Sequence, residues 1–258
     1  MQGRRIVLTR NPGGASRLAR RLEDLGAETL SIPLIDVRED VDALAAGDIF
    51  KEFASYEWLL FTSRNGVDHF LSLFLRAYED IRSLGFVRIG VIGQGTVEAL
   101  ARYHLKPDLV APKATAADLA RALGEEQTLD NTKVLIITGN RNSEELPKEL
   151  WEQRAIVDAL QVYSTHFCDL SGNEAAATFR AEGADAIVFA SASAVEAFGE
   201  QAKHLSLQKG ARVPALCSFG PTTSARMKAA GIPVAVEADH PGLDGMVEAL
   251  VSYFSDKD

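Results

Sequence analysis

The sequence predicts an α/β fold of two similar domains, in which parallel sheets are flanked by helices. Short apolar runs rich in β-branched residues alternate with segments of helical periodicity along most of the 258 residues. The same order of motifs occurs twice. Glycine also follows two of the expected helices, at Gly26 and Gly231, where a left-handed residue commonly ends a helix. Such alternation is typical of parallel sheets covered by helices on both faces.

Nine short runs are expected as strands because they combine apolar and β-branched residues between turn signals. In chain order they are Arg5–Thr9, Glu28–Ile32, Trp58–Thr62, Arg88–Ile92, Lys133–Thr138, Ile156–Leu160, Ala186–Ala190, Val213–Ser218 and Val234–Val236. The segments between most of them have helical spacing; in the first, Leu18, Leu22 and Leu25 share a face. These expected helices are 15–25, 66–77, 95–103, 116–123, 143–152, 192–202, 222–230 and 242–253.

An internal repeat supports two domains. Phe61-Thr62-Ser63 recurs as Phe189-Ala190-Ser191, and Gly93-Gln94-Gly95-Thr96 recurs as Gly220-Pro221-Thr222-Thr223. The opening strand also matches the one at Lys133–Thr138, and all offsets lie between 127 and 129 residues. A repeat of this length indicates duplication of an α/β unit rather than a solenoid.

Composition excludes several classes of protein. The formal net charge is −9 and no basic stripe is visible, so nucleic acid is not expected as a partner. No apolar run reaches the ~18 residues that span a bilayer, and the first ten residues lack the apolar stretch of a secretory signal. The two cysteines form no C-x-x-C pattern, which fits a cytoplasmic protein. We also expect a monomer.

Nucleotide, metal and serine-hydrolase sites are also not expected. Gly93-x-Gly95 lacks the third glycine of the dinucleotide fingerprint, because position 98 is Glu98, and no phosphate loop occurs. The five histidines are scattered, which argues against a metal site, and no G-x-S-x-G elbow is present. We therefore expect no cofactor. Trp58, Trp151 and Cys217 lie in apolar patterns and are expected in the core.

Candidate binding residues lie where strands end and helices begin. Ser63 and Ser191 follow strands directly, and the two glycine motifs at 93–96 and 220–223 do the same. Each stretch is expected to cap a helix, and together they describe two rims of hydroxyl and backbone N–H groups suited to a carboxylate or phosphate. Tyr163 lies between the two patterned halves, where it either packs or donates a proton into a cleft.

Taken in order, these motifs resemble the uroporphyrinogen-III synthase family over nearly the whole chain. The resemblance rests on Val7-Leu8-Thr9-Arg10, the Pro33 segment, Trp58 to Val67, Gly93-x-x-Thr96, Glu145-Leu146-Pro147-x-x-Leu150, Val162-Tyr163-x-Thr165, Phe189-x-Ser191 and Gly220 to Thr223. It implies a discontinuous α/β domain of residues 1–35 and 167–258, a second of residues 38–161, and a two-stranded extended linker at 33–38 and 161–167. The ligand would lie in a cleft between the domains.

The resemblance also implies the reaction. Hydroxymethylbilane, a linear tetrapyrrole with eight carboxylates, would lose water and close to uroporphyrinogen III with inversion of its last pyrrole ring, without a cofactor. Tyr163 matches the family's cleft tyrosine and would assist departure of the hydroxyl, a role that water can also fill. Propionate and acetate groups would bind to the matched rim residues, which are Ser63, Asn65, Thr96, Ser191, Ser193, Thr222 and Thr223. Arg10 and Arg64 would either add charge-assisted bonds or belong to a solvated face.

The chain departs from the family pattern in three segments. Thr138 and Asn140 stand in a segment where the family has leucine-arginine-glycine, Arg154 replaces a glycine, and Val97 replaces an alanine. Arg141 is a candidate to take over the lost arginine's role. The departures leave open a non-catalytic two-domain paralogue that binds a small molecule. An unrelated transferase using an activated sugar or nucleotide is a second alternative, which the missing phosphate loop disfavours.

Overall fold

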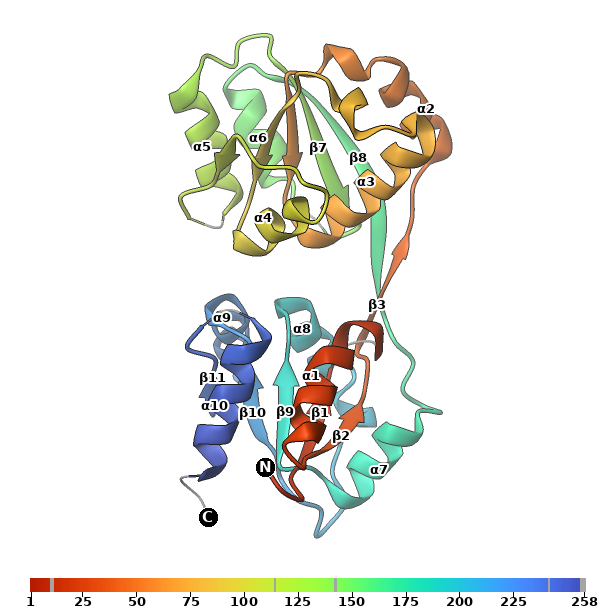
Figure 1. The fold of residues 1–258 in the computed structure, drawn as a ribbon, viewed down its shortest axis with the longest axis vertical. Coiled ribbons are helices and arrows are strands. Elements are labelled where there is room, and N and C mark those ends of the chain that lie inside the picture. The colour runs from red at the N-terminus through yellow and green to blue at the C-terminus, as the bar shows by residue number, and fades with distance from the viewer. Residues whose placement is uncertain (10–11, 114, 142, 241, 256–258) are drawn as a thin grey trace. The chain divides into compact units, whose positions relative to one another are not determined.

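The computed structural model describes residues 1–9, 12–113, 115–141, 143–240 and 242–255. The chain divides into two compact units (Figure 1). The first comprises Met1–Asp36 and His166–Asp258, and the second comprises Val37–Thr165. The first unit is therefore discontinuous in sequence, because the chain leaves it once and returns.

The first unit holds a five-stranded sheet in the order β11-β10-β9-β1-β2, in which all neighbours are parallel. Its strands are β1 (Arg5–Leu8), β2 (Glu28–Ser31), β9 (Ala186–Phe189), β10 (Ala215–Ser218) and β11 (Val236–Glu237). Strand β9 is buried along its whole length, as expected for a central strand between two layers of helices.

Helices cover both faces of this sheet. Apolar residues of α1 and α10 pack on one face, and those of α7, α8 and α9 pack on the other (Figure 1). These helices are α1 (Pro12–Asp24), α7 (Glu174–Glu182), α8 (Ala192–Glu200), α9 (Pro221–Ala229) and α10 (Leu243–Ser255), with a short 3-10 helix at Ala202–His204. Gly26 and Gly231 adopt φ values of 84° and 71°, which confirms the expected left-handed residues after α1 and α9.

The second unit holds a six-stranded sheet in the order β3-β8-β7-β4-β5-β6. Its strands are β3 (Ile35–Glu39), β4 (Trp58–Phe61), β5 (Arg88–Val91), β6 (Leu109–Val110), β7 (Lys133–Gly139) and β8 (Ile156–Phe167). From β8 to β6 the neighbours are parallel. The register between β7 and β8 shifts at Thr138/Gly139, so that Gly139 pairs with Tyr163 and Val162 is the extra residue of a bulge.

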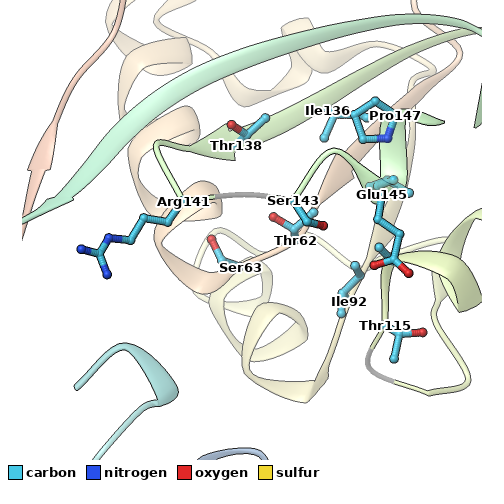
Figure 2. Close-up of a pocket in the computed structure, with 12 residues that line it drawn as sticks. Thr62, Ser63, Ile92, Thr115, Ile136, Thr138, Arg141, Ser143, Glu145 and Pro147 are labelled. Atoms are coloured by element: carbon cyan, nitrogen blue, oxygen red, sulfur yellow. The ribbon is translucent and has the colours of Figure 1, made fainter. Parts of the chain in front are cut away.

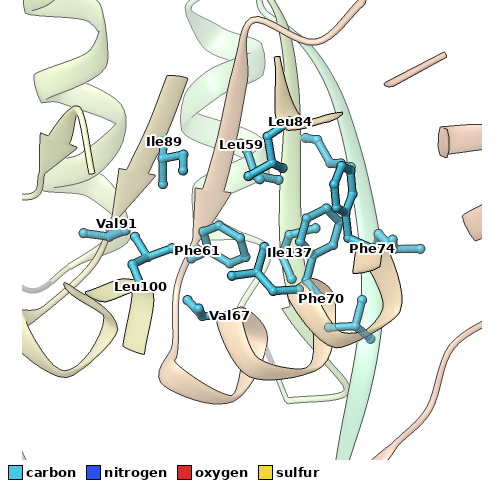
Figure 3. Close-up of a cluster of buried hydrophobic side chains, with 14 of the residues drawn as sticks. Leu59, Phe61, Val67, Phe70, Phe74, Leu84, Ile89, Val91, Leu100 and Ile137 are labelled. Carbon is cyan, nitrogen blue, oxygen red and sulfur yellow. The ribbon is translucent and has the colours of Figure 1, made fainter. Parts of the chain in front are cut away.

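Residues of the central strands alternate between two apolar layers. Leu59 and Phe61 of β4 face the layer made by α2, α3 and α4, where Phe70 and Phe74 pack (Figure 3). Trp58 and Leu60 face α5 and α6. The helices are α2 (Ala43–Lys51), α3 (Arg64–Tyr78), α4 (Gln94–Ala101), α5 (Ala116–Glu126) and α6 (Glu145–Glu152), with 3-10 helices at Phe53–Ser55 and Ile81–Leu84.

The two sheets share one strand order. In the first unit β2, β1, β9, β10 and β11 follow one another, and in the second β8, β7, β4, β5 and β6 do. The sequence repeat relates β1 to β7 and the β9–β11 segment to the β4–β6 segment. Each unit thus combines the front of one repeat with the back of the other, as expected of a duplicated chain.

Some predicted elements end at other residues than expected, and one residue expected in the core is exposed. Trp151 is 58% exposed rather than in the core, because it follows the buried Leu150 and therefore points about 100° away around α6. The strand expected from Val213 begins only at Ala215, since Pro214 has no N–H for the ladder, and Val213 is exposed. Leu25 lies beyond the end of α1 and is 43% exposed. Trp58 and Cys217 are fully buried, as predicted.

Two helices and two strands were not expected from the sequence. Helix α2 contains a glycine and an exposed leucine, and α7 is rich in alanine, so neither has a clear apolar stripe. Strand β6 has two residues, and β3 lies in the segment expected as an extended linker. Among the described residues, no helix combines the length and the apolar character needed to cross a bilayer.

Candidate active site

The second unit gathers polar side chains at the carboxyl ends of its strands. Within the sheet, β5 and β6 lie on one side of β4, and β7 and β8 lie on its other side. The order of strands therefore reverses between β4 and β7. In open parallel sheets, ligands bind beyond the carboxyl ends of the strands at such a point.

Ser63 caps the start of α3, two residues beyond the end of β4. Its backbone is extended, with φ −154° and ψ 157°, and its Oγ accepts a hydrogen bond from the Gly66 N–H at 3.0 Å. The predicted cap is confirmed. A Cβ at position 66 would lie 3.3 Å from the Ser63 Oγ, so the helix start is tightly packed. This cap holds the Ser63 hydroxyl at the edge of the sheet.

Tyr163 approaches the same edge from β8. Its hydroxyl lies 3.0 Å from the Ser63 Oγ, and its side chain is largely buried. The ring of His69 stacks on it, with centroids 5.7 Å apart and planes inclined by 20°. The Tyr163 ring also packs closely on Gly139, where an added Cβ would lie 2.4 Å from the Tyr163 Cζ. The bulge, the glycine and the stacked histidine together orient the tyrosine hydroxyl toward Ser63.

Asn140 ties the strand that carries Tyr163 to the end of β7. Its side-chain Oδ1 accepts from the Thr165 N–H at 2.9 Å, and its Nδ2 donates to the Thr165 carbonyl at 3.3 Å. The Asn140 backbone N–H donates to the Tyr163 carbonyl at 3.3 Å. These bonds replace regular ladder pairing beyond the register shift and keep β8 beside β7.

The α4 start differs from that of α3. Its cap is Gly93 at φ 77°, and no side chain caps the first N–H groups. Thr96 is buried, and its hydroxyl donates to the Ile92 carbonyl at 2.7 Å. The Thr96 hydroxyl proton therefore bonds the backbone of the turn that joins β5 to α4. The guanidinium of Arg64 lies against Gly95, where a Cβ would meet its Nη2 at 2.8 Å, and Asn65 is half-buried in the first turn of α3.

A pocket of about 410 Å³ opens at this edge of the sheet (Figure 2). Hydroxyl groups, one guanidinium and one carboxylate share its lining with apolar side chains. The lining residues are Thr62, Ser63, Ile92, Thr115, Ala116, Ile136, Thr138, Arg141, Ser143, Glu145, Leu146 and Pro147. In Figure 2 Arg141 and Glu145 lie at opposite ends, with Thr62 and Ser143 between them. Such a lining suits a ligand that has an apolar ring and carries acidic groups on one side.

Sequence reasoning missed most of this pocket. Of its lining, only Ser63 was a candidate binding residue, and Arg141 was a candidate replacement for a lost arginine. Thr115 caps α5 through the Asp118 N–H at 3.1 Å, and Glu145 stands in the first turn of α6. Both positions read as ordinary helix starts. Their place between the end of a strand and the helix that follows it was one signal that could have found them. For Glu145, its place in the matched motif Glu145-Leu146-Pro147 was another.

Ionisation around the pocket follows from its hydrogen bonds. The hydrogen bond from the Thr115 hydroxyl is the main cause that lowers the pKa of Asp118, and Arg121 and Lys113 add to it. Asp118 therefore stays a carboxylate at neutral pH. In the first unit, burial raises the pKa of the Cys217 thiol to about 12, which keeps it protonated and unreactive. Among the described residues, no three His, Cys, Asp or Glu side chains are grouped so as to hold a metal.

The first unit carries the repeat of this edge. Ser191 caps α8 in an extended conformation, and its Oγ accepts from the Ala194 N–H at 3.2 Å and lies 3.1 Å from the Ser193 Oγ. The cap residue of helix α9 is Gly220, with φ 153°, and no side chain caps this helix. Thr222 is exposed and Thr223 is buried in its first turn. Arg10, the remaining expected binding residue, lies outside the described residues.

Three curated relatives match nearly the whole chain at low identity. The uroporphyrinogen-III synthase of Synechococcus elongatus is 27% identical, over 96% of this chain and 94% of its own. The porphyrin biosynthesis protein HemD of Ruminiclostridium josui is 26% identical over 96% of this chain, which spans 48% of that protein's length. The chloroplastic uroporphyrinogen-III synthase of rice is 25% identical over 95% of this chain and 79% of its own.

Solved structures share the fold. A mutant uroporphyrinogen III synthase from Thermus thermophilus superposes with a TM-score of 0.72 at 18% identity, over 98% of this chain and 100% of its own. The Helicobacter pylori uroporphyrinogen-III synthetase gives 0.60 at 20% identity, over 98% of this chain and 99% of its own. The family model HEM4, described as uroporphyrinogen-III synthase HemD, matches residues 16–248. The chain therefore belongs to the uroporphyrinogen-III synthase (HemD) family.

Proposed function

We propose that this chain is a lyase that cyclises hydroxymethylbilane to uroporphyrinogen III, with loss of water and inversion of the last pyrrole ring. Family membership supports this function, and it does not favour the non-catalytic alternative. The observation that carries the proposal is the hydroxyl pair of Tyr163 and Ser63, 3.0 Å apart, beside the pocket at the reversal of strand order. The product belongs to tetrapyrrole and haem biosynthesis.

The reaction needs a held geometry more than a strong acid or base. The terminal C–O bond breaks, the hydroxyl takes a proton and leaves as water, and the pyrrole nitrogen stabilises the resulting cation. The substituted carbon of the last pyrrole then attacks, and the spiro intermediate rearranges with loss of a proton. Ring closure without an enzyme gives the uninverted isomer, so the protein acts by holding the chain in the inverting geometry.

Tyr163 is proposed to assist departure of the hydroxyl. Its oxygen lies 3.0 Å from the Ser63 Oγ, and its ring is held by Gly139 and His69, which leaves little rotational freedom. With Ser63 donating to that oxygen, the Tyr163 O–H is left to donate to the departing hydroxyl. A donor that is already oriented lowers the barrier because no reorganisation is needed during bond breaking. Replacement by phenylalanine keeps the ring and removes the O–H.

The carboxylates of the substrate are proposed to bind at the helix starts. Ser63, Asn65 and Arg64 would serve at α3, with Arg10, Ser191, Ser193, Thr222 and Thr223 in the first unit. At α4 the Thr96 hydroxyl bonds the Ile92 carbonyl, so Thr96 would hold the turn while the uncapped N–H groups of Gln94 and Gly95 bind the anion. Such groups bind carboxylates within a chain of net charge −9, because the helix dipole is local.

The connection between the domains and the oligomeric state are also proposed. The paired segments 33–38 and 161–167 would form the extended connection between the domain of residues 1–35 and 167–258 and the domain of residues 38–161. The enzyme would act as a monomer in the cytoplasm, where its two cysteines stay reduced. Sedimentation equilibrium gives the mass directly, and a dimer mass would contradict the monomer.

Product isomers test the function. Freshly prepared hydroxymethylbilane is incubated with the protein, the products are oxidised to porphyrins, and the type I and type III isomers are separated. We expect type III in large excess. Tyr163→Phe should lower kcat about 10- to 100-fold while the product remains type III, since general acid catalysis is partly replaced by water. Only type I product, formed at the rate seen without protein, would refute the function.

A further inference from the structure

The pocket of the second unit contains one carboxylate that a site for a polyanion does not need. Glu145 lines the pocket, is exposed, and has no cation paired with it among the residues that the structure describes. A carboxylate beside a ligand with many carboxylates is repelled by them unless it faces a hydrogen-bond donor. Apart from its terminal hydroxyl, a bilane offers such donors only at its pyrrole N–H groups.

The two ends of the pocket differ in the sign of their charge. Arg141 lies at one end and Glu145 at the other. The hydroxyl residues Ser63, Thr62 and Ser143 lie between them, and the apolar side chains of Ile92, Ile136 and Pro147 lie at the Glu145 end (Figure 2). A substituted pyrrole has the same polarity, because its N–H lies on one edge and its acetate and propionate chains are attached to the opposite edge. The flat carbon ring between them matches the apolar lining.

The pocket also borders the residue proposed to act on the leaving hydroxyl. Ser63 lines it, and the Ser63 Oγ lies 3.0 Å from the Tyr163 hydroxyl. A ring seated in the pocket would therefore have its neighbouring substituent carbon close to these hydroxyls. Of the four rings, the one that bears the hydroxymethyl group is the ring that reacts there.

We propose that this pocket binds the pyrrole ring that carries the hydroxymethyl group, with its N–H donating to Glu145 and its carboxylates bound by Arg141. This inference rests on the proposed function. When the C–O bond breaks, the electron pair leaves with oxygen, water departs after protonation, and positive charge spreads to the pyrrole nitrogen. Glu145 then accepts a hydrogen bond from a cationic N–H, which is stronger than the bond to the neutral ring. The carboxylate thereby stabilises the transition state more than the bound substrate.

A simpler role for Glu145 is to stabilise α6, since acidic residues favour the first turn of a helix. Glu144 separates the two roles. It is the cap residue of the same helix, its side chain makes no capping bond, and it is not part of the pocket lining. Replacement of either glutamate by glutamine removes one negative charge from the same helix start.

Steady-state kinetics with isomer analysis test the inference on wild type, Glu145→Gln, Glu144→Gln and Arg141→Met. We expect Glu145→Gln to lower kcat about 10- to 100-fold with KM within about threefold, because a transition-state interaction is lost. Glu144→Gln should remain within about twofold of wild type. Arg141→Met should raise KM about tenfold or more through loss of a charge-assisted bond.

The outcomes distinguish failure of the inference from failure of the function. If the wild type forms type III product but Glu145→Gln matches Glu144→Gln, or changes KM alone, the assignment of Glu145 is overturned while the function stands. If the wild type forms no type III product, the function fails and the inference fails with it. Thermal unfolding of both glutamine variants shows whether they lose the same helix stability.

Discussion

Gly139→Ala tests whether the glycine orients Tyr163. The added Cβ would lie 2.4, 2.5 and 2.9 Å from three ring carbons of Tyr163, against ordinary contacts of 3.4–4 Å. The ring must therefore retreat by about 1 Å, and its stacking on His69 and its bond to Ser63 oppose that movement. Overpacking of this kind costs about 1–3 kcal/mol of unfolding free energy. A displacement of about 1 Å at a reacting group lowers kcat about 100-fold.

Urea unfolding and the isomer assay measure the two effects separately. Gly47→Ala is the matched control, because position 47 lies within α2 of the same unit and an added Cβ meets nothing within 4 Å. There alanine should raise the unfolding free energy by up to about 1 kcal/mol and leave kcat unchanged. If Gly139→Ala keeps both wild-type stability and wild-type kcat, the ring is not held by this glycine and the reasoning fails.

Three further predictions concern single groups. Arg154 adopts φ 65°, which strains any residue but glycine, so Arg154→Gly should raise the unfolding free energy by about 0.5–1 kcal/mol. Arg154→Ala keeps the strain and loses the exposed ion pair to Asp130, so it should not stabilise the protein. A higher urea midpoint for the alanine variant than for the glycine variant would contradict this. The pKa of Asp118 is lowered in the folded state, mainly by the Thr115 hydroxyl. The ionised Asp118 therefore stabilises the protein at any pH above the pKa of an aspartate in the unfolded chain, about 4. That stability is lost as the pH falls through the lower pKa of the folded state. Asp118→Asn should therefore flatten the loss of stability on acidification, followed by urea unfolding between about pH 5 and 2.5. Burial raises the pKa of Cys217 to about 12, so in a Cys168→Ser background a thiol reagent at pH 8 should react only after unfolding, and prompt reaction of the native protein would refute its burial.

Local sequence patterns were enough to predict the α/β fold class and the positions where helices begin. Ser63 and Ser191 were predictable as caps because a short hydroxyl side chain after a strand satisfies a free N–H by itself. Gly26 and Gly231 were predictable for a similar reason, since glycine takes the left-handed conformation that ends a helix without the steric strain of other residues. The duplication was also visible, because it requires only that two stretches of one chain be compared.

Burial and pairing at the ends of elements were less predictable. Trp151 has the composition of a core residue, but its exposure depends on which side of α6 meets the sheet. The bulge at Val162 of β8 depends on how β7 and β8 pair, which no residue of either strand specifies alone.

The sequence by itself determined the order of strands and helices, the polar helix starts and the family, because each depends on residues close together in the chain or on their order. Only the tertiary structure decided that Tyr163 meets Ser63, one hundred residues away, and that Arg141 and Glu145 end up in one pocket. Those contacts arise from the reversal of strand order between β4 and β7. Sheet pairing, rather than local propensity, brings the loops after those strands to one edge, and this pairing is a long-range interaction.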